Sequence, residues 1–163
     1  MPRLSTIELF KESMKFSAGH FAIFASDTRE NLHGHNYNVC ASFTTIIEDE
    51  GMSFDYRHYK KKVRVICDSL NEITLLPEKS KYLKFEAAGN YTNVYFSNEK
   101  IIFLNRDIKI LPVYNITVEE LSNWVLNQIL LDQNELAQNK IQAIRIKVYS
   151  GPGQSGSAEW RKE

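Results

Sequence analysis

Alternation of apolar and polar side chains marks several stretches of the chain as half-buried strands. In residues 7–20, Phe16, Ala18 and His20 fall on one side of an extended backbone, while a lysine and a serine fall on the other. Successive side chains of a strand point to opposite faces of the sheet, so this pattern is typical of a strand that covers a core. By the same reasoning the sequence predicts strands over 33–47, 82–86 and 141–150, a hairpin of 93–97 and 100–104 that turns at Asn98-Glu99, a loop over 21–32, and a flexible segment over 151–157.

Two stretches repeat apolar residues at helical spacing. Asp55 is a candidate N-cap for the first helix, and Thr117 starts the second, with Glu120 three residues later as in a capping box. The apolar stripes are Tyr59, Val63, Ile66 and Leu70 in the first helix and Leu121, Trp124, Val125 and Ile129 in the second. The resulting order, β-β-α-β-β-α-β, predicts an α+β protein with an antiparallel sheet and helices on one side of it.

Length, charge and cysteine content narrow the class of protein. The chain has 163 residues and no repeat or low-complexity linker, so residues 1–163 are expected to form a single domain. Twenty basic residues balance twenty acidic ones, which predicts neither nucleic acid nor a membrane surface as a partner. No apolar stretch approaches the roughly 18 residues of a spanning helix, and no signal-peptide pattern begins the chain. Cys40 and Cys67 are too few for a disulfide framework and are expected to be reduced thiols in a cytoplasmic protein.

Three histidines are the candidate metal-binding residues. In the segment "LHGHNYNVC", His33 and His35 lie two residues apart, so they point the same way from one strand. His20 ends the preceding strand, and pairing of the two strands would bring three imidazoles together. Three neutral imidazoles with an open fourth position form a catalytic zinc site, whereas the alternative is that these are ordinary core histidines. Cys40 lies an odd number of positions from both and faces away, so it is interpreted as a small buried apolar residue.

The segments "FSAGH" and "HGHNYNV", in which His20 and His33 are thirteen positions apart, resemble the zinc signature of the 6-pyruvoyl-tetrahydropterin synthase and 6-carboxytetrahydropterin synthase family. The resemblance covers about residues 8–160, and includes "MSFDYRHYKKKV", "NITVEELSNWVLNQ" and "IKVYSGP". It implies the tunnelling fold: a four-stranded antiparallel sheet with two helices on one face, which closes a β-barrel as a trimer, and two trimers stack into a hexamer. It also implies one Zn²⁺ per chain, bound by His20, His33 and His35, and a pterin-like small-molecule substrate at a subunit interface.

Several positions depart from the family pattern. The loop before the histidines carries Glu30 where the family has a cysteine, and this resembles a subgroup with "RE-x-LHGHNY" that cleaves the side chain of dihydroneopterin triphosphate. A carboxylate beside zinc can act as a general base. The family's aspartate–histidine relay falls on Asn71 and Glu72, which makes Glu72 an alternative base. Its pterin-gripping glutamate falls on Ser150, a residue without charge. Candidate substrate-binding residues are therefore Thr117, Ser150, Glu119 and Glu159.

Three hypotheses follow from these residues. The first is a zinc-dependent carbon–oxygen or carbon–carbon lyase, or a synthase, that acts on a reduced pterin such as 7,8-dihydroneopterin triphosphate, with Glu30 as base. The second is a family member that acts on a different small hydroxylated substrate, since the pterin-binding carboxylate is absent. The third is a non-catalytic relative whose metal serves a binding or structural role.

Overall fold

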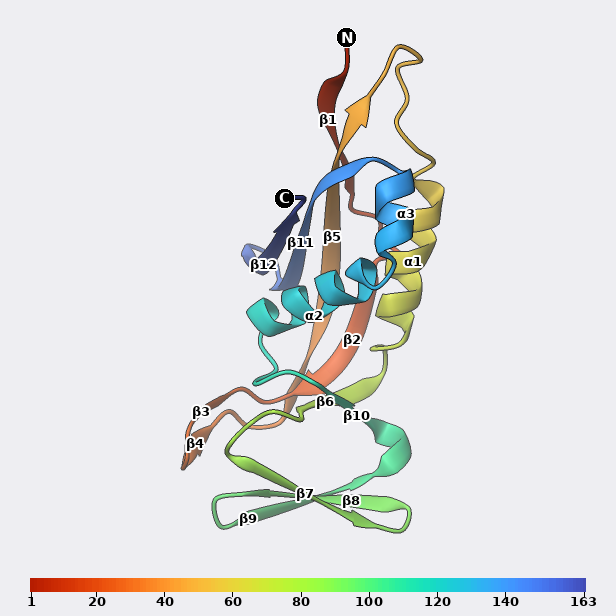
Figure 1. The fold of residues 1–163 in the computed structure, drawn as a ribbon. Coiled ribbons are helices and arrows are strands. Elements are labelled where there is room, and N and C mark those ends of the chain that lie inside the picture. Colours follow the sequence, from red (N-terminus) through yellow and green to blue (C-terminus); the bar gives the residue numbers. More distant parts are fainter.

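The main sheet is built around one long strand, β5 (His33–Ile47). The computed structural model describes all residues from Met1 to Glu163. On one side, the two ends of β5 pair antiparallel with β1 (Arg3–Leu9) and β2 (Lys15–His20). The sheet order is β10-β6-β2-β5-β11-β12, and its remaining strands are β6 (Ile73–Pro77), β10 (Ile108–Leu111), β11 (Ile141–Gly151) and β12 (Gln154–Arg161). Figure 1 shows β5 running through the centre of this sheet.

The sheet is larger than the four antiparallel strands that were predicted. It has seven strands and is mixed, because β6 runs parallel to both β2 and β10. The predicted strand over 7–20 is in fact two strands. The amide of Met14 donates to the carbonyl of Lys11, and this turn separates β1 from β2 before both pair with the same neighbour.

Three helices cover one face of the main sheet (Figure 1): α1 (Arg57–Asp68), α2 (Val118–Leu130) and α3 (Gln133–Gln138). The first two were predicted, and α3 was not. Helix α1 begins at Arg57, two residues after the predicted cap, although the Asp55 carboxylate still accepts the Arg57 amide at 3.0 Å. At α2, Thr117 Oγ1 accepts the Glu120 amide at 3.3 Å as predicted, but the Glu120 carboxylate accepts the amide of Tyr114 at 2.9 Å instead of closing the capping box. No helix is long and apolar enough to cross a membrane.

The core lies between the helices and the inward side chains of the sheet. Alternate residues of β5, such as Tyr37, Val39 and Phe43, are buried against the helices, as strand periodicity predicts. Position 156 has room only for glycine. A Cβ there would lie 2.5 Å from the backbone of Val118, so only glycine allows β12 to pass this close to α2.

A second, three-stranded sheet lies apart from the main one (Figure 1) and consists of β7 (Leu83–Ala88), β8 (Tyr91–Phe96) and β9 (Glu99–Leu104). The predicted hairpin is confirmed, but its turn lies at Ser97-Asn98, one residue earlier than predicted, because Glu99 already pairs with Phe96. A short 3₁₀ helix, Asn105–Asp107, follows β9. Residues 21–32, predicted as a loop, contain a small hairpin of β3 (Ile23–Ala25) and β4 (Thr28–Arg29). The segment predicted to be flexible forms the turn between β11 and β12 and the first half of β12.

Candidate metal and catalytic site

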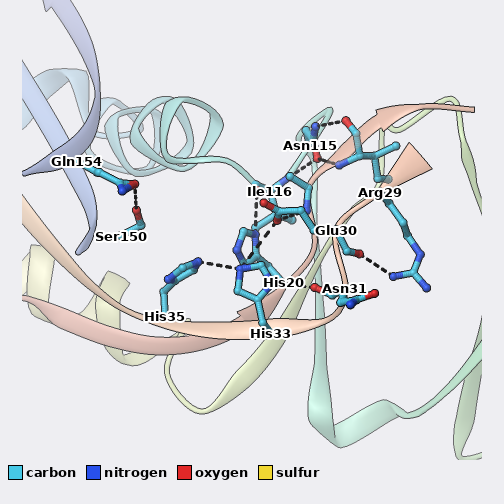
Figure 2. Close-up of polar contacts among 12 residues, drawn as sticks. His20, Arg29, Glu30, Asn31, His33, His35, Asn115, Ile116, Ser150 and Gln154 are labelled. Atoms are coloured by element: carbon cyan, nitrogen blue, oxygen red, sulfur yellow. Dashed lines mark hydrogen bonds and ion pairs between the residues drawn. The ribbon is translucent and has the colours of Figure 1, made fainter. Parts of the chain in front are cut away.

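The three predicted histidine ligands converge on one face of the sheet. The register of β2 and β5 places His20 directly opposite His33, and His35 follows two residues later on the same face. Their ring centroids lie 4.6–5.0 Å apart, and the ligand atoms all lie within 4.8 Å of one another. Figure 2 shows the three histidine side chains beside one another. His20 is buried, whereas His33 is exposed and His35 is half-buried, so the cluster opens to solvent on one side.

Backbone carbonyls orient two of these rings. His20 Nδ1 donates to the carbonyl of Ile116 at 2.9 Å, and His33 Nδ1 donates to that of Asn31 at 2.7 Å. A proton on Nδ1 leaves the Nε2 lone pair of each ring free for a metal. His20 Nε2 is buried and has no partner in the protein, and His33 Nε2 lies 2.9 Å from His35 Nε2.

These features fit a zinc ion. Two ligands of a tetrahedral zinc are about 3.4 Å apart, close to the separation of the two Nε2 atoms. Burial lowers the pKa of His20, which favours the neutral ring that a metal requires. The three imidazoles on one face offer three nitrogen donors and leave a fourth coordination position for another ligand. The buried nitrogen without a partner and the fixed tautomers agree with this assignment.

Glu30 lies at the edge of this cluster. It directly follows β4, and its amide donates to the carbonyl of Ala22 at 2.9 Å. Its Oε2 accepts the Ala22 amide at 2.9 Å and lies 3.9 Å from His33 Nε2. Both the backbone and the side chain of Glu30 are therefore fixed by one residue of the neighbouring segment, and its carboxylate faces the histidines (Figure 2).

Arg29 anchors this hairpin to the three-stranded sheet. Its Nη1 donates to the carbonyl of Glu30 at 2.8 Å, while Nε and Nη2 donate to Glu99 Oε2 at 2.9 and 2.7 Å. The guanidinium carbon also lies 4.9 Å from the ring centroid of Phe21 and 5.7 Å from that of Phe96. No sequence pattern indicates this role, because the partner carboxylate of Glu99 lies 70 positions away in the chain.

Asn115 was also missed, and its side chain binds the backbone of two segments that hold Glu30 and His20. Its Oδ1 accepts the amides of Ile23 and Ile116 at 3.1 and 3.0 Å, and its Nδ2 donates to the carbonyl of Ile23 at 2.8 Å. The only local signal is its place just before the Thr117 cap of α2. Nothing in the sequence indicates that the side chain would bind a segment 92 residues away.

The predicted relay residues do not contact the histidines within this chain. Asn71 Oδ1 accepts the amide of Ser17 at 2.8 Å, and the amide of Glu72 donates to the carbonyl of the same serine at 2.7 Å. Glu72 lines an open cavity of about 430 Å³ together with His35 and Asp107. No hydrogen bond or ion pair joins Glu72 to the histidine cluster, and its role stays a prediction.

The four candidate substrate-binding residues are dispersed. Thr117 caps α2, and Glu119 is exposed in the first turn of that helix. The Ser150 hydroxyl lies 3.5 Å from Gln154 Oε1, away from the histidines in Figure 2. Glu159 pairs with Arg145, whose neighbour across the sheet is Ser42, so it lies on the face opposite the histidines. The structure does not bring these four into contact with the histidines.

Both cysteines are buried, as predicted. Burial raises the pKa of Cys40 to about 11 and that of Cys67 to about 12. Such thiols are protonated at neutral pH and are poor nucleophiles.

Known pterin synthases are similar to this chain in both sequence and structure. Over 142 residues, the chain is 26% identical to a candidate 6-carboxy-5,6,7,8-tetrahydropterin synthase of Methanocaldococcus jannaschii, and the alignment covers 86% of each protein. The 6-pyruvoyl tetrahydropterin synthase of Plasmodium falciparum superposes with a TM-score of 0.92 at 30% identity and covers 98% of this chain and 99% of that one.

The Plasmodium vivax 6-pyruvoyltetrahydropterin synthase superposes equally well, with a TM-score of 0.92, 26% identity, and coverage of 98% of this chain and 99% of that one. Two variants of the vivax protein have also been solved, in which a glutamate described as the catalytic residue is replaced by alanine or cysteine. The sequence model of the family described as 6-pyruvoyl tetrahydropterin synthase matches residues 8–161. This chain belongs to the 6-pyruvoyl tetrahydropterin synthase family.

Proposed function

We propose that this protein is a zinc-dependent lyase or synthase that acts on the side chain of a reduced pterin such as 7,8-dihydroneopterin triphosphate, with Glu30 as its base. The observation that supports this most directly is the carboxylate of Glu30, fixed 3.9 Å from His33 Nε2 at the open side of three converging imidazoles. One Zn²⁺ per chain would be held by His20, His33 and His35.

The relatives support the choice of a glutamate as base. In the vivax protein a glutamate is described as the catalytic residue, and the segment "RENLHGHNY" of this chain resembles the subgroup that carries glutamate at this place. Neither cysteine is a competing nucleophile, because both thiols are buried and hold their protons.

Glu30 would remove a proton from the substrate side chain during the reaction. The amide of Ala22 binds Oε2 and leaves Oε1 as the oxygen that takes up the proton. Zinc, when bound, would supply Lewis acidity that lowers the pKa of a substrate hydroxyl. Ile116 and Asn31 hold two of the imidazoles in the tautomer that ligates through Nε2, and the proton on Glu30 can then return to the product.

The serine at position 150, in place of a carboxylate, favours a second candidate function. A serine hydroxyl cannot form the two-point charged contact through which a carboxylate grips a pterin ring, and the hydroxyl of Ser150 already faces Gln154. A different small hydroxylated substrate would need no carboxylate at this position. This alternative keeps the same metal site and the same base.

We also propose that the protein assembles as a trimer or a hexamer built from trimers. Strands β10 and β12 each pair with only one neighbour, so both edges of the seven-stranded sheet present unpaired backbone groups. Pairing of such edges between subunits would remove them and close a barrel.

The experiment that tests the function compares the variants Glu30→Gln and Glu72→Gln. The zinc-loaded proteins would be incubated with dihydroneopterin triphosphate, and the products identified by mass spectrometry. Glu30→Gln keeps the shape of the side chain but removes the proton acceptor, so turnover should fall about 10²–10⁴-fold while zinc content is unchanged. Loss of turnover in Glu72→Gln alone would instead assign the base to Glu72, and absence of product from the unmodified protein would exclude this substrate.

A further inference from the structure

We infer that Asn115 is a positioning residue that couples the metal ligand His20 to the segment that carries Glu30. The inference rests on the proposed function for its catalytic consequence, but its geometric basis is independent of any substrate. Asn115 contacts neither a histidine nor Glu30 directly, so its effect would pass through the backbone of Ile23 and Ile116.

The first half of the coupling runs to the base. The Asn115 amide pairs with both the amide and the carbonyl of Ile23, as a neighbouring strand would. Ile23 follows Ala22, whose amide and carbonyl bind the carboxylate and the amide of Glu30. The position of the Glu30 carboxylate therefore depends on a segment that Asn115 holds from its other side.

The second half runs to the metal ligand. Asn115 Oδ1 also accepts the amide of Ile116, and the carbonyl of Ile116 accepts the Nδ1 proton of His20. Ile116 is fully buried and His20 is 7% exposed, so water cannot easily replace these contacts. One side-chain amide thus fixes both the peptide that sets the tautomer of His20 and the peptide next to Glu30 (Figure 2).

The chemistry of the amide explains why asparagine is required. Two amide donors meet Oδ1 and one carbonyl meets Nδ2, so the site needs an acceptor and a donor on the same short side chain. Aspartate has the same shape, but its second oxygen would face the carbonyl of Ile23. Asn115→Asp is therefore the most informative variant.

Three measurements test the coupling: zinc affinity by competition with a chelator, hydrogen exchange of the amides of residues 22–30, and steady-state kinetics. For Asn115→Asp we expect the zinc Kd to rise about tenfold, the size of effect known for residues that orient a metal ligand. Exchange at Ile23 and Glu30 should accelerate about tenfold, and kcat should fall about tenfold with KM within about threefold.

Asn105→Asp is the matched control. Asn105 also bridges backbone and side chain, since Nδ2 donates to the carbonyl of Gly89 and Oδ1 accepts the hydroxyl of Thr92, but it lies beyond β9, away from the histidines. It should leave zinc affinity and exchange of residues 22–30 unchanged. The inference would be overturned if Asn115→Asp behaved like this control. In that case its zinc Kd and its amide exchange rates would stay within about twofold of those of the unmodified protein.

A measurement on the unmodified protein covers the case in which Asn115→Asp does not fold. Coupling is reciprocal, so removal of zinc by a chelator should accelerate exchange at Ile23 and Glu30 if His20 and this segment are linked. Identical exchange with and without zinc would contradict the coupling. If the protein does not process dihydroneopterin triphosphate, the proposed function fails, yet zinc affinity and exchange still decide the role of Asn115.

Discussion

Replacing Arg29 by alanine should destabilise the protein by about 3 kcal/mol, a large effect for one residue outside the main core. The magnitude follows from three kinds of contact. The hydrogen bond from a cationic group to the carbonyl of Glu30 contributes about 1.5 kcal/mol or more. Stacking over Phe21 and Phe96 contributes about 0.5–1 kcal/mol. The ion pair with Glu99 contributes about 0.5 kcal/mol, because that carboxylate is 51% exposed and screened by water.

Two further variants separate these contributions. Arg29→Lys keeps the charge but cannot donate to Glu30 and Glu99 at once, so its cost should be intermediate, about 1.5–2 kcal/mol. Glu99→Gln removes only the weak ion pair and should cost about 0.5 kcal/mol or less. The expected order of stability is therefore unmodified protein, Glu99→Gln, Arg29→Lys and Arg29→Ala.

Urea unfolding at one fixed protein and zinc concentration measures these differences, because both assembly and bound metal raise apparent stability by mass action. A cost of less than about 1 kcal/mol for Arg29→Ala would refute the additive reasoning. A cost for Glu99→Gln equal to that of Arg29→Ala would show that the ion pair, rather than the carbonyl and ring contacts, holds the hairpin.

Three further predictions concern the metal, the thiols and the assembly. Metal analysis should find about one zinc per chain in the unmodified protein and little in His33→Ala or His35→Ala, since a site with two protein ligands binds zinc weakly; a full complement in either variant would disprove the ligand assignment. Cys40 and Cys67 should react with a thiol reagent at pH 8 only after unfolding, because their raised pKa values leave almost no thiolate in the folded protein, and fast labelling of the folded protein would contradict their burial. Light scattering at micromolar concentration should give a mass of three or six chains, and a monomer would rule out edge pairing between subunits.

The histidine cluster could be predicted from the sequence because strand geometry is strictly periodic. Two residues that are two apart on a strand share a face whatever the rest of the fold does, so "HGH" alone placed His33 and His35 together. His20 required one more assumption, pairing of adjacent strands, and the register of β2 and β5 confirms it. The helices were predictable for a similar reason, as their apolar stripes recur every three or four residues.

Pairing between segments distant in the chain could not be predicted in the same way. Strand β6 runs parallel to β2, and β10 adds to β6 from more than thirty residues later, so neither pairing leaves a local signal. The split of the first predicted strand did leave a local signal, because the inward residues fall on odd positions in β1, such as Ile7 and Leu9, and on even positions in β2, such as Phe16 and Ala18. Local periodicity determines which face a residue occupies, but it does not determine which strand lies beside it.

The same distinction separates the ligands of the site from the residues that orient them. The ligands belong to one motif, whereas the carbonyl that sets the tautomer of His20 lies 96 positions away, at the entry to α2. Asn115, which binds the backbone of Ile23 in the hairpin before Glu30, directly precedes Ile116 in the chain. By the proposed coupling, a change at this helix entry would reduce activity even where all three histidines are kept. We therefore expect activity to depend on Asn115 and Glu30 as well as on the three histidines.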